Sequence, residues 1–400
     1  MTLPDLEHVR ADFPALRDPD AGPIVYLDSA ASTLRPEQVI DAVADYYRGN
    51  GANIHRGKHY LSELASDRYE NARLSVAEFL GARAAEVVFV RNTTEALNLV
   101  AGGLGLTPAD SVVTTLDAHH SNLLPWRAHA SVRTVPVLPS GEVDLDAYER
   151  ELRREPRVVA LTACSNVTGV RPPVERMVKQ ARDAGALVVV DAAQYVPHRG
   201  NAFRDLGADF IAFSAHKMCG PAGVGVLCGR LEALEQLRPT AIGGGTVDWV
   251  SLDETRIRRV PHRFEYGTPD IAGVIGLGAT VDYLEGVGLG ELAAHDSALA
   301  RMLLDACAAS PRLTVIGGDA SLDRSAIVSV AIEGVARLEH VARALSDSYG
   351  VMCRSGHLCA QPLVDHLAGG PVLRLSAYLY NTPTEIETAL DALEEIVRAL

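Results

Sequence analysis

The sequence predicts an α/β protein with two lobes: a large lobe built on a mostly parallel, seven-stranded sheet, and a smaller α+β lobe. Over the first two thirds of the chain, short β-branched runs alternate with Ala-, Leu- and Glu-rich stretches, as in sheets whose strands are joined by helices. Several runs are apolar on both faces, which is typical of central strands covered on each side. The alternation changes after about residue 285, and 400 residues suit two packed lobes.

The predicted strands of the large lobe lie at residues 86–90, 111–115, 133–137, 158–162, 187–191, 210–214 and 223–228. Helical spacing separates them, for example at residues 172–185, which end in glycine. In the smaller lobe we expect strands at 327–332, 351–354 and 372–376, and helices at 338–349 and 383–400. The expected domains are a large one over residues 21–284 and a small one over residues 285–400, with residues 1–20 packing near the small domain because chain termini often lie close together.

Composition and charge exclude several classes of function. A formal net charge of −14 argues against a nucleic-acid partner, because such binding draws on positive charge. No run approaches the ~20 apolar residues that cross a bilayer, and the N-terminus lacks the apolar core of a signal peptide, so we expect no membrane association. The six cysteines include no CxxC pair, which argues against a disulfide framework or zinc ribbon and favours a cytoplasmic location.

Lys217 is the most informative residue. It follows an apolar strand directly and precedes a Gly-Pro turn. Most lysines are solvated surface residues, but ligands bind at the strand ends of an α/β sheet. A partly desolvated lysine has a lowered pKa and forms Schiff bases with carbonyl cofactors.

Asp191 ends another apolar strand, one strand before Lys217. An aspartate there either caps the next helix or pairs with a protonated pyridine nitrogen and strengthens a cofactor as an electron sink. The presence of Asp191 and Lys217 on successive strands favours the second interpretation.

Hydroxyl and imidazole groups follow two further strands. Thr93 and Thr94 open a helix, where they serve as N-caps or, with the free N–H groups and the helix dipole, bind phosphate. The segment has neither GxGxxG nor a Walker loop. His119 and His120 are adjacent, so a shared metal is not expected. The pair has a packing or surface role, or one ring stacks on a flat cofactor and moves protons.

Cys359 differs from the other cysteines because it lies in a polar loop with Arg354 and His357 nearby. Positive neighbours favour the thiolate, the nucleophilic form. Arg374 stands alone among apolar residues. A buried arginine has an anionic partner, which is either a substrate carboxylate or a structural carboxylate.

Together, these motifs resemble the class V aminotransferase family of pyridoxal-phosphate (PLP) enzymes of fold type I, and within it the SufS-like group II cysteine desulfurases and selenocysteine lyases. The match runs from YLDSAAST at residues 26–33 to RLSAYLYNT at residues 374–382. Between them, TTE, HHSN, SNVTG, DAAQ, FSAHK, GPAGVG, RFEYGTP and RSGHLCA follow in family order. Any one motif is weak, whereas the ordered set is specific.

The resemblance implies a role for each matching residue. Lys217 would hold PLP covalently, with Asp191 on the pyridine nitrogen and Gln194 near the ring oxygen. His119 would stack on the ring and transfer protons. The phosphate would be held by Thr93, Thr94, Ser214 and His216, and Thr268 would reach the phosphate of the neighbouring subunit in a homodimer. Binding of the substrate would involve Asn166, Arg374, Arg354, His55 and Arg56.

The implied reaction converts L-cysteine to L-alanine. Cys359 would take the sulfur as a persulfide and pass it to a small acceptor protein, for synthesis of Fe–S clusters or another sulfur-containing product. Three positions depart from the family pattern: Ala118 replaces a glutamate, Leu358 a histidine and Cys219 an aromatic residue. The alternatives are another class V enzyme (a selenocysteine lyase, a pathway-specific C–S lyase, an epimerase or a transaminase) and a non-catalytic partner subunit.

Overall fold

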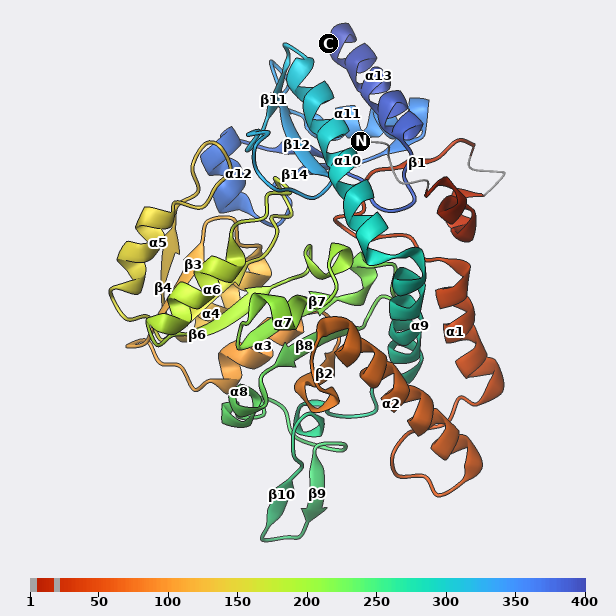
Figure 1. The fold of residues 1–400 in the computed structure, drawn as a ribbon, viewed down its shortest axis with the longest axis vertical. Coiled ribbons are helices and arrows are strands. Elements are labelled where there is room, and N and C mark those ends of the chain that lie inside the picture. The colour runs from red at the N-terminus through yellow and green to blue at the C-terminus, as the bar shows by residue number, and fades with distance from the viewer. Residues whose placement is uncertain (1–5, 18–21) are drawn as a thin grey trace.

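The computed structural model describes residues 6–17 and 22–400. The part of the predicted N-terminal segment at residues 1–5 and 18–20 lies outside the described residues. Two main sheets with helices around them make up most of the described part of the fold (Figure 1): a large sheet and a smaller one near the C-terminus. Two further pairs of strands lie beside them.

The large sheet has seven strands in the order β2–β8–β7–β6–β5–β3–β4. Only β8 runs antiparallel to its neighbours, so the predicted mostly parallel, seven-stranded sheet is confirmed. In chain order the strands are β2 (Val87–Val90), β3 (Ser111–Thr115), β4 (Ser131–Val135), β5 (Val158–Thr162), β6 (Leu187–Asp191), β7 (Phe210–Ser214) and β8 (Gly225–Gly229).

Alternate residues of these strands enter two different apolar clusters, because successive side chains of a strand point to opposite faces. On β6, Val188 and Val190 belong to one cluster and Val189 to the other. The first cluster also holds residues of α2 (Tyr60–Leu80), α5 (Leu145–Leu152), α6 (Val174–Asp183), α7 (Ala202–Leu206) and α9 (Ile271–Val287). The second holds residues of α3 (Thr93–Gly103), α4 (Leu124–His129) and α8 (Leu231–Gln236). Both faces of the sheet are therefore covered, which explains its continuous apolar strands.

The smaller sheet is antiparallel, in the order β11–β12–β15–β14. Its strands are β11 (Leu313–Val315), β12 (Ile327–Ile332), β14 (Arg354–Gly356) and β15 (Val372–Ser376). A third apolar cluster joins this sheet to α10 (Leu289–Ala309), α11 (Leu338–Tyr349) and α13 (Pro383–Ala399). The helix α12 (Gln361–Ala368) follows β14, and β13 (Val351–Met352) pairs in parallel with β1 (Val25–Tyr26).

The proposed domain boundary at 284/285 falls in the last turn of α9, and α10 begins at Leu289. Strand β1, which the sequence assigns to the large domain, pairs with β13 beside the small sheet. The division into two domains stays a prediction.

The remaining elements lie around the two sheets. Helix α1 (Glu37–Gly49) packs against α9. A hairpin of β9 (Val247–Val250) and β10 (Thr255–Ile257) projects from the bottom of the view in Figure 1. Short 3₁₀ turns occur at Glu7–Asp12, Pro14–Leu16, Ala84–Glu86, His120–Asn122, Val196–His198, Ala215–Lys217 and His262–Phe264. Within residues 6–17 and 22–400, no single helix is long and apolar enough to span a membrane; α9 and α10 together have the length and composition but are bent by 78°.

Candidate active site

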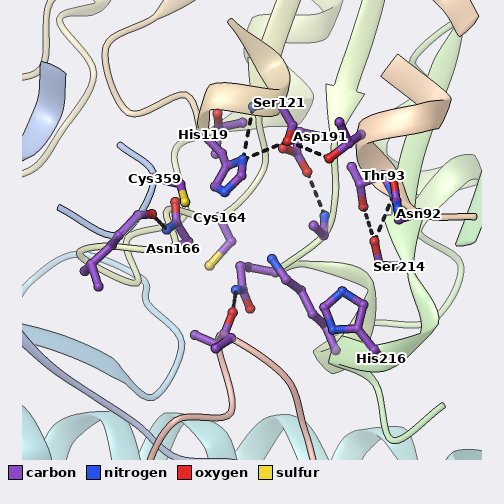
Figure 2. A pocket seen from close by; sticks show the side chains of 18 of the residues that line it. Asn92, Thr93, His119, Ser121, Cys164, Asn166, Asp191, Ser214, His216 and Cys359 are labelled. Atoms are coloured by element: carbon purple, nitrogen blue, oxygen red, sulfur yellow. Dashed lines mark hydrogen bonds between the residues drawn. The ribbon is translucent and has the colours of Figure 1, made fainter. Parts of the chain in front are cut away.

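A cavity of about 250 Å³ lies at the carboxyl ends of β5, β6 and β7, beside the first turn of α3, and β14 and β15 of the small sheet contribute its other wall. Figure 2 shows its interior. It brings together most of the predicted site residues, from both sheets: Thr93, Thr94, His119, Asn166, Asp191, Gln194, Ser214, His216, Lys217, Arg354, Cys359 and Arg374.

Lys217 is half-buried at the end of the 3₁₀ turn that continues from β7. Burial lowers the pKa of its amine, and the carboxylate of Asp191 partly opposes this effect. Because a lowered pKa increases the neutral, nucleophilic fraction of the amine, Lys217 is suited to bond with an aldehyde.

Asp191 ends β6, which is adjacent to β7 in the sheet. Its Oδ1 accepts a hydrogen bond from the Ala193 N–H at 3.0 Å. Burial raises the pKa of Asp191 and the positive charge of Lys217 lowers it. Gln194, also predicted here, donates its side-chain N–H to the Ala30 carbonyl at 2.7 Å, which fixes its amide at the edge of the cavity.

Hydroxyl groups gather at the N-terminus of α3. The Thr93 N–H donates to Ser214 Oγ at 2.9 Å, and the two hydroxyls lie 2.7 Å apart. The Thr94 hydroxyl lies 2.7 Å from that of Ser121, and Asn92 caps the helix by accepting from the Glu95 N–H. In Figure 2, Asn92, Thr93 and Ser214 lie across the cavity from Cys359. The positive end of a helix together with hydroxyl donors is suited to phosphate.

His119 faces the cavity just before the 3₁₀ turn His120–Asn122. Its Nδ1 accepts a hydrogen bond from the Ser121 N–H at 3.1 Å, so the proton of the neutral ring lies on Nε2. Burial, then the nearby Lys217, lowers the pKa of His119 to about 4. Burial and Lys217 likewise lower the pKa of His216 to about 4. Both rings are therefore neutral near pH 7.

Cys359 is exposed and lines the cavity from the loop between β14 and α12. Leu358 and Cys359 both have left-handed backbone conformations, with φ of 54° and 57°. Two hydrogen bonds hold them: His120 N–H donates to the Cys359 carbonyl at 2.9 Å, and the Asn166 side chain donates to the Leu358 carbonyl at 2.8 Å. The side chain of Leu358 is buried. His357 pairs with Asp365 at 3.3 Å.

Arg374 is buried on β15 and forms two polar contacts. Its Nη2 lies 2.9 Å from Asp28 Oδ1, and its Nη1 donates to the Asn166 carbonyl at 3.0 Å. Burial lowers the pKa of Arg374, and Asp28 opposes this effect. The sequence left open whether the partner of Arg374 is structural or a substrate; Asp28 is a structural partner, and the guanidinium still lines the cavity.

His55, Arg56 and Thr268 do not line this cavity. They line a second one, together with His262 and Glu265. His55 Nε2 lies 2.8 Å from Glu70 Oε1.

Asp28, Ser121 and Cys164 are among the lining or neighbouring residues that sequence reasoning missed. Asp28 stands in the YLDSAAST motif and Ser121 in HHSN, so the motifs held the signal for both. Cys164 lines the cavity as a second thiol, buried, with its Sγ donating to the Gly169 carbonyl. A free cysteine is most often a buried apolar residue, so its sequence alone gave no sign of this position.

Comparison with known protein families identifies the class of protein to which this fold and cavity belong. The family model described as "Aminotransferase class-V" matches residues 25–389, so the chain belongs to the aminotransferase class-V family. This confirms the resemblance and the predicted fold type I. The family implies PLP as cofactor.

Within the family the chain is similar to cysteine desulfurases. It is 39% identical to a probable cysteine desulfurase of Streptomyces coelicolor, over 98% of this chain and 97% of that one. It is 41% identical to a cysteine desulfurase of Enterobacter sp. (strain 638), over 99% of both. The solved structure of a cysteine desulfurase from Thermococcus onnurineus matches with a TM-score of 0.93 at 38% identity, over 100% of this chain and 99% of that one.

Proposed function

We propose that this chain is a PLP-dependent cysteine desulfurase that converts L-cysteine to L-alanine and takes the sulfur on Cys359. The observation that carries the proposal is that a half-buried amine, Lys217, and an exposed thiol, Cys359, line one cavity. Similarity to desulfurases along nearly the whole chain supports it.

The lining residues fit PLP chemically. The amine of Lys217 suits an aldehyde, the carboxyl of Asp191 suits the ring nitrogen, and the hydroxyls at the start of α3 suit a phosphate. When bound, PLP supplies an electron sink for the α-carbon of the substrate.

The protein's own groups bind the substrate and move its protons. The guanidinium of Arg374 and the amide of Asn166 orient the substrate carboxylate. The amine of Lys217, whose pKa is lowered by burial, is the group suited to accept a proton from the substrate. The neutral ring of His119 holds a proton on Nε2 that it can donate.

Cys359 then performs the sulfur transfer. Its sulfur, which lines the same cavity, attacks the sulfur of the substrate as a thiolate. An S–S bond forms and the Cβ–S bond breaks. The electron pair stays with the β-carbon, which takes up a proton, and the product leaves as alanine.

The exposure of Cys359 supports delivery of the sulfur to a small acceptor protein, for Fe–S clusters or another sulfur-containing product. A cytoplasmic location is part of the proposal and is supported by the six free cysteines.

We also propose that the enzyme is a homodimer in which Thr268 completes the phosphate site of the neighbouring subunit, with His55 and Arg56 near that site. Within one chain these three residues line the second cavity and not the first, which supports a role for them at the site of the other subunit. Helices α1 and α2 also expose large apolar side chains, including those of Tyr47 and Tyr60, as an interface between copies requires.

The test is incubation of the PLP-loaded protein with L-cysteine, followed by measurement of alanine and mapping of sulfur by mass spectrometry. We expect alanine and a persulfide on Cys359. Cys359→Ser should reduce alanine formation by at least ~100-fold, because it removes the attacking atom. Cys353→Ser, in which the replaced thiol has a pKa raised to about 12 by burial, is the matched control and should retain activity. Alanine formation without sulfur on Cys359 would contradict the proposal and favour another class V reaction.

A further inference from the structure

Asp117 is a buried carboxyl close to the site, with no role in the mechanism above. It lies in the turn after β3, which the Ala118 N–H closes by donating to the Thr115 carbonyl at 3.1 Å. Asp117 is 4% exposed. Its Oδ1 has no hydrogen-bond partner among the described residues. Because burial of a carboxyl oxygen without a partner is costly, this position requires an explanation.

The order of strands places Asp117 at the same end of the sheet as Asp191, where the parallel strands have their carboxyl ends. Strand β5 lies between β6, which ends at Asp191, and β3, which precedes Asp117. Thr162, the last residue of β5, is the register partner of Asp191, and both line the cavity. The Thr162 hydroxyl is also buried and unpartnered. With strands about 4.8 Å apart, the two carboxyl positions lie roughly 10 Å apart, across Thr162.

Asp117 changes its charge between pH 5 and pH 7.5, whereas two titratable groups close to it do not. Burial raises the pKa of Asp117 to about 6; the Thr115 side chain opposes this effect, and the negative charge of Asp191 adds to it more weakly. The other group whose charge couples to Asp117 is Cys164, in the loop after β5, and burial raises the pKa of that thiol to about 12. His119, two residues along the chain, has a pKa lowered to about 4. Between pH 5 and pH 7.5, Cys164 and His119 therefore keep one protonation state, whereas Asp117 ionises.

We propose that Asp117 is a positioning residue that acts through Asp191, as a second carboxyl adding negative charge at the end of the cavity where the nitrogen of the PLP ring would lie. The inference rests on the proposed function, since it requires PLP in this cavity. Ionised Asp117 stabilises a proton held between Asp191 and the ring nitrogen, because negative charge favours the protonated form of a neighbouring group. Protonated Asp117 contributes no such charge.

The test compares wild type with Asp117→Asn, which keeps the shape of the side chain but cannot ionise. Cofactor-free protein is titrated with PLP at pH 5 and at pH 7.5, and the absorbance of bound PLP is recorded. We expect equal affinities at pH 5 and, at pH 7.5, binding weaker in the variant on the order of tenfold, as expected for one charge at this distance. The pH midpoint of the bound-PLP absorbance should also shift in the variant, which a merely structural role would not produce.

Asp347→Asn, at an exposed carboxylate on α11, is the matched control and should behave as wild type. If Asp117→Asn folds poorly, Asp117→Ser, smaller and also uncharged, should give the same pH-dependent difference. Equal affinities and equal absorbance midpoints for wild type and variant at both pH values would overturn the inference alone. Failure of wild type to bind PLP would overturn the proposed function, and the inference with it.

Discussion

At the scale of a single residue, Asp28 affects how strongly Arg374 binds the carboxylate of the substrate. The Asp28 carboxylate already pairs with the guanidinium at 2.9 Å, so a substrate carboxylate has to share it. Asp28→Asn keeps a hydrogen-bond acceptor and removes the competing charge. We therefore expect a KM for L-cysteine lower by about threefold to tenfold, corresponding to roughly 1 kcal/mol.

Asp28→Ala separates orientation from charge. It removes the acceptor as well, so Arg374 loses its alignment and KM should rise rather than fall. Steady-state kinetics of the two variants measure both effects. A KM that changes in the same direction in both variants would contradict the role given to Asp28.

At the scale of elements, the packing of α3 against the sheet sets the position of the hydroxyl groups that gather at the N-terminus of α3. Gly225, at the start of β8, has no room for a side chain: a Cβ there would lie 2.6 Å from Asn92 Cα and 2.8 Å from the Phe213 carbonyl. Gly225→Ala therefore should displace the first turn of α3 and cost about 1–3 kcal/mol of unfolding free energy. PLP affinity, measured by titration, should fall at the same time.

Gly286→Ala is the matched control for this substitution. A Cβ at Gly286, in α9, meets no atom within 4 Å, so stability and PLP affinity should be retained. Unchanged PLP affinity in Gly225→Ala would show that the start of α3 does not set the phosphate site.

The burial of a strand decides whether its bounds could be predicted from the sequence. The bounds of β5, β6, β7, β12 and β15 match the prediction, because these strands are buried and mostly apolar. Strand β4 was expected at residues 133–137 and lies at Ser131–Val135. It is an edge strand in which two of the five residues are exposed, so hydrophobicity does not mark its start. Val137 instead bridges to Val143.

The site could be predicted where a motif held the chemistry and not where contacts were long-range. Lys217 and Asp191 end apolar strands, and a local pattern shows this. The contact of Arg374 with Asp28 joins residues 346 positions apart, and no local pattern encodes it. Asp117 was not identified because an aspartate in a turn is ordinary in sequence, and only its burial in the fold distinguishes it.

At the scale of the whole molecule, subunit mixing tests the proposed homodimer. If Thr268 acts in the neighbouring site, Lys217→Ala and Thr268→Ala each impair the homodimer. A mixed dimer would contain one site with both native residues. Mixing the two variants under conditions that allow exchange should therefore restore activity, up to roughly a quarter of the wild-type level when half of the dimers are mixed and each has one intact site. Mixtures with no more activity than the average of the separate variants would contradict this arrangement.

Acid should destabilise the molecule through His198, a buried residue that is not part of the first cavity's lining. Burial lowers the pKa of His198 to about 4, below its value near 6.5 in an unfolded chain. The unfolded state therefore binds the proton first, and stability present above pH 6.5 is lost as pH falls toward 4. The loss from this group is on the order of 2–3 kcal/mol.

Urea unfolding at pH 7 and at pH 4.5 measures this loss. His198→Gln cannot take up the proton, so the stability of that variant should depend less on pH over this interval than the stability of wild type. An equal pH dependence in both proteins would assign the acid sensitivity to other groups.

The contact of Arg374 with Asn166 also couples the two sheets mechanically. Its guanidinium extends from β15 of the small sheet to the Asn166 carbonyl, in the loop that leaves β5 of the large sheet. A ligand that binds this guanidinium therefore stabilises the contact that joins the two sheets. Amide hydrogens along β15 and in the loop at residues 163–169 should exchange more slowly once an amino acid is bound, even where they do not touch it.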